Sequence, residues 1–243
     1  MDPLTAIAAS GLRARMESLD LLANNSANSS TSGYKADREF YSLYVAPEAQ
    51  EAGSSTTMPL VESPWIDLTQ GTVRSTGNSL DLALSGKGFF SVDGPNGTIY
   101  TRNGNFRLDP TGKLVTADGY AVRGTAGALT LQSSLPIEIA NDGSIEQGGQ
   151  SAGQLAVADF PGGEGLLKQG SNYFRAVDAS VKPVAATGVS VEQGKLEDSN
   201  AGSAQAAISV VGIMRQFEML QKAAQIGNDM GKQAIEQVAR VGS

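Results

Sequence analysis

The chain contains no cysteine and no histidine among its 243 residues. Their absence removes disulfides, thiolate nucleophiles, imidazole bases and the ligands of most transition-metal sites. We therefore expect no metal, no cofactor and no catalytic residue of these kinds. Paired carboxylates are the acid–base chemistry that remains.

Positive charge is also scarce, because 25 Asp and Glu residues outnumber 18 Lys and Arg residues and the formal net charge is −7. Nucleic-acid binding requires clustered cations that face phosphates, and the sequence has no run of lysine or arginine. It also has no apolar run of 18 residues and no charged segment followed by an unbroken apolar stretch at its start. We expect neither a nucleic-acid partner nor a membrane span, and no cleaved secretory signal.

Helical periodicity is present at both ends of the chain. Apolar residues recur in steps of three and four from Pro3 to about Asn28, and again from about Ala204 to Arg240. Asp2 followed by Pro3 is a favourable helix start. At ~1.5 Å per residue the helices would be ~39 Å and ~55 Å long. The apolar stripe of such a helix needs a cover, either the other terminus or a neighbouring subunit.

The C-terminal segment carries two adjacent apolar rows. A two-stranded coiled coil needs one row, so this helix is expected to contact more than one neighbour. Gln221, Asn228 and Gly231 interrupt the first row, and such breaks more often fix register than bind a ligand. The first row is Ala207, Val210, Met214, Phe217, Ala224, Ile235 and Val238, and the second is Ile213, Leu220, Ala223, Met230, Ala234 and Val241.

Glycine and turn signals dominate the middle of the chain. Alternating apolar residues at 80–84 precede Gly86-Lys87-Gly88, and the segments 93–97 and 109–112 have the composition of tight turns. Turns recur roughly every 8 to 12 residues, which favours an antiparallel sandwich or barrel over a βαβ fold. The preceding segment, from Tyr34 to about Thr69, has mixed character and is interpreted as a linker.

A wall-cutting hydrolase would have to use the acidic residues of this middle region. Most of them stand at turn positions, where aspartate binds its own backbone, so catalysis is not needed to explain them. The favoured interpretation is a chain that is not an enzyme. The aspartates concerned are Asp81, Asp93, Asp109, Asp118 and Asp142.

Short motifs are spread over nearly the whole chain. They start in the N-terminal helix, continue through the β region and end in the C-terminal helix. They comprise Ala9–Leu12, Leu22–Asn28, Thr31–Lys35, Thr76–Leu84, Gly86–Phe90, Tyr100–Phe106, Leu114-Val115, Gly119-Tyr120, Val191–Glu197, Ser199-Asn200, and the helix residues Arg215, Phe217, Glu218, Asp229 and Met230.

Together these motifs resemble the bacterial flagellar basal-body rod and hook family. The chain departs from the family pattern at Ser26, where an aliphatic residue is usual, at Ser29, where alanine is common, and in the turn that contains Leu220 and Gln221. It is short for a hook protein, which carries an extra outer domain. The opening 37 residues look most like the proximal rod proteins, with the distal rod proteins as close relatives.

The resemblance implies a mixed α and β fold. Long N- and C-terminal helices would pair as a coiled-coil layer, and a central antiparallel β-rich domain, sandwich or barrel-like, would lie between them in sequence. The implied parts are an inner (D0) helix at 1–36, an extended linker at 37–74, an outer (D1) β-rich domain at 75–185, an extended return segment at 186–203 and a second inner (D0) helix at 204–243.

The resemblance also implies a structural axial subunit that polymerises helically through its terminal helices and transmits torque from motor to hook. Its partners would be copies of itself, other rod subunits and the flagellar type III export apparatus, and its place would be the periplasmic rod. An extracellular oligomeric binding module and an acidic-residue cell-wall hydrolase are the alternatives. The assembly interface is expected at Leu12, Met16, Leu19, Val210, Met214, Phe217, Leu220 and Met230.

Overall fold

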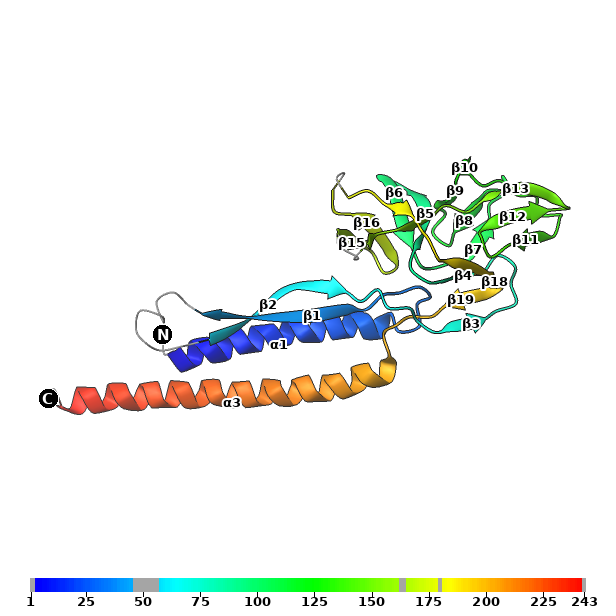
Figure 1. The fold of residues 1–243 in the computed structure, drawn as a ribbon. Helices are drawn as coiled ribbons and strands as arrows, with labels where there is room; N and C mark the ends of the chain where they lie inside the picture. The colour runs from blue at the N-terminus through cyan, green and yellow to red at the C-terminus, as the bar shows by residue number, and fades with distance from the viewer. Residues whose placement is uncertain (1–2, 46–56, 162–164, 179–180, 242–243) are drawn as a thin grey trace. The chain divides into compact units, whose positions relative to one another are not determined.

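The structure is a computed structural model that describes residues 3–45, 57–161, 165–178 and 181–241. Asp2, the expected N-cap, lies outside these residues. The chain divides into two compact units, each assembled from separate stretches of sequence (Figure 1). The first unit comprises Met1–Ala27, Asp37–Asp67 and Gly202–Ser243, and the second comprises Asn28–Ala36 and Leu68–Ala201.

The first unit contains two helices and a β-hairpin. The helices are α1 (Pro3–Ala27) and α3 (Ser203–Val241), and they lie side by side. The hairpin consists of β1 (Asp37–Val45) and β2 (Thr57–Ile66), which pair antiparallel and also contact α1. α1 therefore lies between α3 and the hairpin (Figure 1).

The predicted pairing of the terminal helices as a coiled-coil layer is wrong. α1 has 25 residues and α3 has 39, so at ~1.5 Å per residue α3 is longer by ~21 Å and a continuous seam with α1 cannot cover it. α1 also uses part of its surface to pack against the β1–β2 hairpin. The periodicity located both helices, but it contained no information that strands would cover one side of α1.

The second unit is built of antiparallel strands, and the central β-rich domain predicted from turn spacing is confirmed. Among the described residues, ten strands form the main sheet, and smaller sheets pair β11, β12 and β13, β18 with β4, and β19 with β3. The strands are β3 (Val73–Ser75), β4 (Leu82–Ser85), β5 (Phe89–Gly94), β6 (Gly97–Thr101), β7 (Phe106–Leu108), β8 (Leu114–Thr116), β9 (Ala121–Gly124), β10 (Gly127–Ala128), β11 (Ile137–Ile139), β12 (Ser144–Gln147), β13 (Gln150–Gln154), β14 (Val157–Asp159), β15 (Leu166–Gln169), β16 (Tyr173–Ala176), β17 (Val184–Ala185), β18 (Ser190–Gln193) and β19 (Lys195–Glu197).

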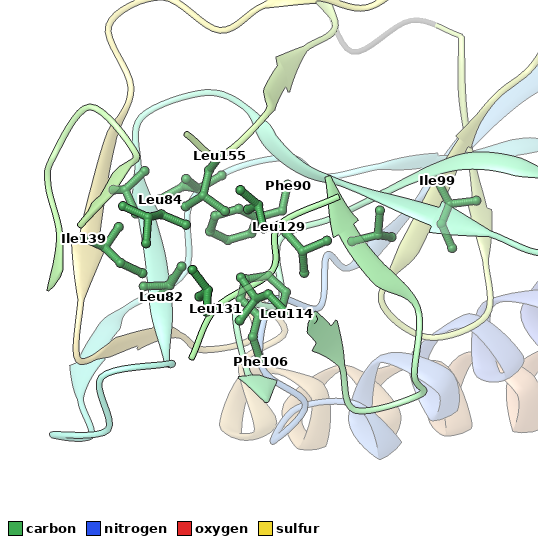
Figure 2. Packing of buried hydrophobic residues seen from close by; sticks show 14 residues of the cluster. Leu82, Leu84, Phe90, Ile99, Phe106, Leu114, Leu129, Leu131, Ile139 and Leu155 are labelled. Atoms are coloured by element: carbon green, nitrogen blue, oxygen red, sulfur yellow. The ribbon is translucent and has the colours of Figure 1, made fainter. Parts of the chain in front are cut away.

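One apolar core holds the second unit together. It draws residues from β4, β5 and the later strands, and Figure 2 shows Leu82, Leu84 and Phe90 among them. Phe90 and Phe106 meet edge to face with ring centroids 5.1 Å apart. Val191 of β18 belongs to the same core, so residues that precede α3 in the sequence help to complete it.

Two segments expected to be extended connections carry regular pairing. The expected linker at 37–74 contains the β1–β2 hairpin and β3, and the expected return segment at 186–203 contains β18 and β19. β18 pairs with β4 in a register that opposes Val191 to Leu84, and β19 pairs with β3. These partners lie about a hundred residues away in the sequence, which is why local patterns gave no sign of the pairing.

Candidate assembly surface and the buried charge cluster

One row of residues on α3 faces α1. A Cβ placed on Gly11 of α1 would lie 3.1 Å from Leu220 Cδ2, so the two helices approach closely here. Residues in steps of three and four from Leu220 share its side of the helix, and all of them are buried or half-buried. They are Ala206, Val210, Ile213, Phe217, Ala224, Gly227 and Gly231. This row takes members from both rows expected from the sequence.

A second row stands roughly 130° around the helix from the first and is exposed. We call it the outer α3 row. It consists of Ile208, Met219, Ile226 and Met230, whose exposed fractions are 68%, 62%, 59% and 56%. Val211 and Met214 add exposed apolar side chains elsewhere on α3, and Met16 does so on α1. The charged residues Arg215, Glu218, Lys222 and Asp229 are also exposed on α3.

The eight residues expected at the assembly interface fall into two groups. Met16, Met214 and Met230 are exposed, and the other five are half-buried: Leu12, Leu19, Val210, Phe217 and Leu220. The expectation missed Ile208, Val211, Met219 and Ile226, which are exposed. Steps of 11, 7 and 4 along the outer row would have revealed most of these. Side chains of the expected rows beyond Gln233 lie outside the described residues.

The outer row has the chemistry of a surface that another chain covers. Single exposed apolar side chains are ordinary on proteins, whereas a set aligned along one helix is typical of an interaction site. Covering such a row removes apolar surface from water at about 25 cal/mol per Å². The row therefore favours binding of an apolar partner surface.

A second feature, inside the β unit, is a cluster of three buried charged side chains. Glu197 lies between Lys35 and Arg102, with side-chain exposures of 0%, 1% and 4%. Lys35 Nζ lies 2.5 Å from Glu197 Oε1, and Arg102 Nε lies 2.8 Å from Glu197 Oε2. Lys35 also donates to the Thr69 carbonyl, and Arg102 Nη1 donates to the carbonyls of Gly86 and Gly88. We call these three residues the charge cluster.

The charge cluster explains why several motifs contain the residues that they do. Lys35 closes the motif 31–35, Arg102 lies in 100–106, and Glu197 ends 191–197, so motifs far apart in sequence meet at one carboxylate. Close backbone approach demands glycine beside it. A Cβ on Gly33, where φ is +70°, would lie 2.3 Å from the Asn103 nitrogen, and one on Gly104 would lie 1.7 Å from the Leu82 oxygen.

Asp109 and Asp142, two of the five aspartates that a hydrolase would need, are used by turns. Asp109 Oδ1 accepts hydrogen bonds from the amides of Thr111 and Lys113, and Asp142 accepts from Ser144. Hydrogen bonds from Thr111 and from the Lys113 amide lower the pKa of Asp109, and those from Ser144 lower the pKa of Asp142. A glycosidase acid needs the opposite shift.

Asp118 has a different partner. It accepts a 2.6 Å hydrogen bond from the Tyr173 hydroxyl. Burial, reinforced by this bond to Asp118, raises the pKa of Tyr173. This pair joins the turn after β8 to β16, which is a structural role.

Within the described part of the chain, no three His, Cys, Asp or Glu side chains are grouped so that they could hold a metal ion. Neither α1 nor α3, over the residues described, has a stretch that is long and apolar enough to cross a bilayer.

Comparison with known proteins places the chain in a family. Residues 83–149, within the β unit, match the family model described as the flagellar hook protein FlgE/F/G D1 domain. The flagellar basal-body rod protein FlgG of Buchnera aphidicola subsp. Acyrthosiphon pisum is 31% identical over 95% of this chain and 97% of its own length. FlgF of Caulobacter vibrioides is 30% identical over 92% of each chain, and FlgG of Agrobacterium fabrum is 32% identical over 93% of this chain and 95% of its own.

The relatives are rod proteins of the flagellar basal body, and these matches define the class as a structural rod subunit. The chain belongs to the flagellar basal-body rod protein family.

Proposed function

We propose that this protein is a structural axial subunit of the bacterial flagellar basal-body rod and that it assembles through the outer α3 row. The observation that carries this proposal is the exposure of Ile208, Met219, Ile226 and Met230 along one helix. The partners are copies of the same chain and other rod subunits. Met16 and Met214, also exposed, extend the apolar surface available to them.

The energetics support assembly through this row. Fully burying one Leu, Ile, Met or Val side chain contributes about 1.5–3 kcal/mol relative to leaving it exposed. Burial of the four outer-row side chains, each more than half exposed, would therefore contribute several kcal/mol, roughly, to one interface between subunits. Contacts between two different surfaces of identical subunits generate an open helical arrangement when the rotation between neighbours does not close a ring, and this is the arrangement proposed here.

The finer assignment is a proximal, FlgF-type rod protein that transmits torque from motor to hook. Its support is the opening segment of 37 residues, which looks most like the proximal rod proteins. We further propose export by the flagellar type III apparatus, followed by incorporation into the periplasmic rod. The apolar helix surface would then be covered only in the assembled rod.

The assembly surface can be tested by substitution of Met219→Arg with Ile226→Arg. The matched control is Gln221→Arg with Gln225→Arg, which adds the same charge at exposed polar positions of α3. In cells that depend on this protein for motility, the first variant should abolish basal-body assembly and the control should swim normally. Both purified variants should unfold like the parent. Normal assembly with the first variant would contradict the proposed surface.

The type of rod protein can be tested separately by complementation. The chain should restore rod assembly in cells of its source that lack their FlgF-type protein and fail in cells that lack their FlgG. Restoration only of the second strain would assign it to the distal rod.

Sedimentation of the purified chain addresses another class of function, because one stable small oligomer would favour a closed binding module over a rod subunit.

A further inference from the structure

The Glu197 carboxylate joins four segments of the β unit. Its Oε1 accepts hydrogen bonds from Lys35 Nζ and from the Gly71 amide at 2.5 and 2.9 Å, and its Oε2 accepts from Arg102 Nε at 2.8 Å. The segments 28–36, 68–75, 101–105 and 195–201 thus converge on one buried group. Two of them are connections: 28–36 directly follows α1, and 195–201 precedes α3 by one residue.

Charge makes this junction dependent on Glu197. The cluster holds two cations and one carboxylate, all nearly excluded from water. If the carboxylate were missing, Lys35 and Arg102 would lose the counter-ion that they share, and two like charges would remain in a medium that screens them poorly. Lys35 therefore finds a favourable buried position only when residue 197 is already in place.

The backbone of 33–36 also depends on the C-terminal segment. The Gly33 amide donates to the Glu197 carbonyl at 2.8 Å, and the Asn200 amide donates to the Tyr34 carbonyl at 3.3 Å. The Ala36 amide donates to Asn200 Oδ1 at 2.7 Å. Tyr34, Ala36 and Ala201 form a small buried apolar cluster. Main chain, side chain and apolar contacts thus bind the same two segments together.

The C-terminal segment is itself anchored in the body of the unit. Val191 is buried in the main core, and β18 pairs with β4 over Ser190–Gln193. β19 continues this attachment by pairing with β3. Residues 190–201 can therefore fold onto the β body, whereas the hydrogen bonds of the 33–36 backbone to the rest of the unit that are described above come from residues 197 and 200.

We infer that Glu197 is a latch that makes the ordering of residues 28–36 depend on residues 190–201. The connection after α1 stays unordered in a chain whose C-terminal segment has not yet docked on the β body. The latch then fixes the connections to both terminal helices in a single step. This inference concerns the isolated subunit, so it stands or falls independently of the proposed assembly surface.

Native-state hydrogen exchange on the full-length chain tests the latch. In Glu197→Gln, amides at 33–36 should exchange at least about tenfold faster than in the parent, over and above any acceleration that the β5–β6 hairpin shares through global unfolding. The control is Glu192→Gln, which removes a half-buried surface pair with Lys195 and should leave exchange unchanged. Parental protection at 33–36 in Glu197→Gln would overturn the inference. Equal loss over the whole β unit would also overturn it.

A second variant keeps the test decisive if Glu197→Gln does not fold. Asn200→Ala removes the side-chain hydrogen bonds to the Ala36 amide and to Thr69 without stranding a charge. Faster exchange confined to 33–36 and 191–200 supports the latch, and parental exchange at 33–36 contradicts it.

Pulse labelling during refolding of the parent shows which of the two segments, 33–36 or 191–197, becomes protected first. Protection at 33–36 that precedes protection at 191–197 would overturn the dependence.

Discussion

Lys35 and Glu197 lie 162 positions apart in the sequence, yet their side chains form a buried ion pair with a 2.5 Å separation between Nζ and Oε1. Arg102 completes the arrangement by donating a hydrogen bond to the other carboxylate oxygen of Glu197, Oε2. Buried ion pairs cost desolvation, so such a pair is weak evidence for added stability, but breaking it is expensive. The consequence is a site where single substitutions have large effects.

Glu197→Gln should lower the free energy of unfolding of the β unit by about 3–5 kcal/mol, because two buried cations lose their counter-ion. Urea denaturation, monitored by circular dichroism, would measure this loss of stability. Glu192→Gln, at a half-buried surface pair, should change stability by less than about 1 kcal/mol. Equal stabilities of the two variants would show that the charge cluster is energetically unimportant.

Gly104→Ala and Gly212→Ala should change the free energy of unfolding in opposite directions. A Cβ on Gly104 would lie 1.7 Å from the Leu82 oxygen, so the backbone must shift, and we expect a loss of about 1–3 kcal/mol or more. A Cβ on Gly212 meets nothing within 4 Å and replaces glycine inside α3, which should stabilise the helix by up to about 1 kcal/mol. Thermal unfolding of the isolated chain compares them. Destabilisation by Gly212→Ala would contradict the open surroundings of that residue.

Leu220→Ala should weaken the packing of α3 on α1. Leu→Ala in a full core costs about 2–5 kcal/mol, and the half-buried position of Leu220 places this change near or below the lower end of that range. Met219→Ala, in the outer α3 row, should leave the isolated subunit within about 0.5 kcal/mol of the parent. Hydrogen exchange of the α1 and α3 amides would measure the effect of each substitution. A larger effect from Met219 would mean that the outer row is covered within the subunit.

Acid should weaken the turns that Asp109 and Asp142 close. Their pKa values are lowered from the ordinary 3.8, so the stability they contribute is present above about pH 4 and is lost as the pH falls through their folded values. Asp109→Asn should therefore reduce the pH dependence of stability below pH 4. Thermal melts at pH 7 and pH 3 measure the change. A parental acid response in this variant would show that the Asp109 carboxylate is not held by Thr111 and Lys113.

Local patterns predicted the elements whose signals lie within a few residues. Helical spacing located α1 and α3 to within a residue or two, because the i, i+3, i+4 pattern is a property of one continuous segment. The turn chemistry of Asp109 was equally local, since its carboxylate binds the amides of residues two and four positions later. The same reasoning could not choose which apolar residues of α3 face α1, because each apolar stripe was compatible with several partners.

The sequence by itself determined the absence of cysteine and histidine chemistry, the two terminal helices, the glycine-rich β middle and the resemblance to rod proteins. Tertiary structure alone decided that α1 packs against both α3 and the β1–β2 hairpin, that Leu220 faces α1 while Met219 is exposed, and that Lys35, Arg102 and Glu197 meet. The physical reason is range. Periodicity and turn propensity act between neighbours, whereas burial and ion pairing join residues that only the folded chain brings together.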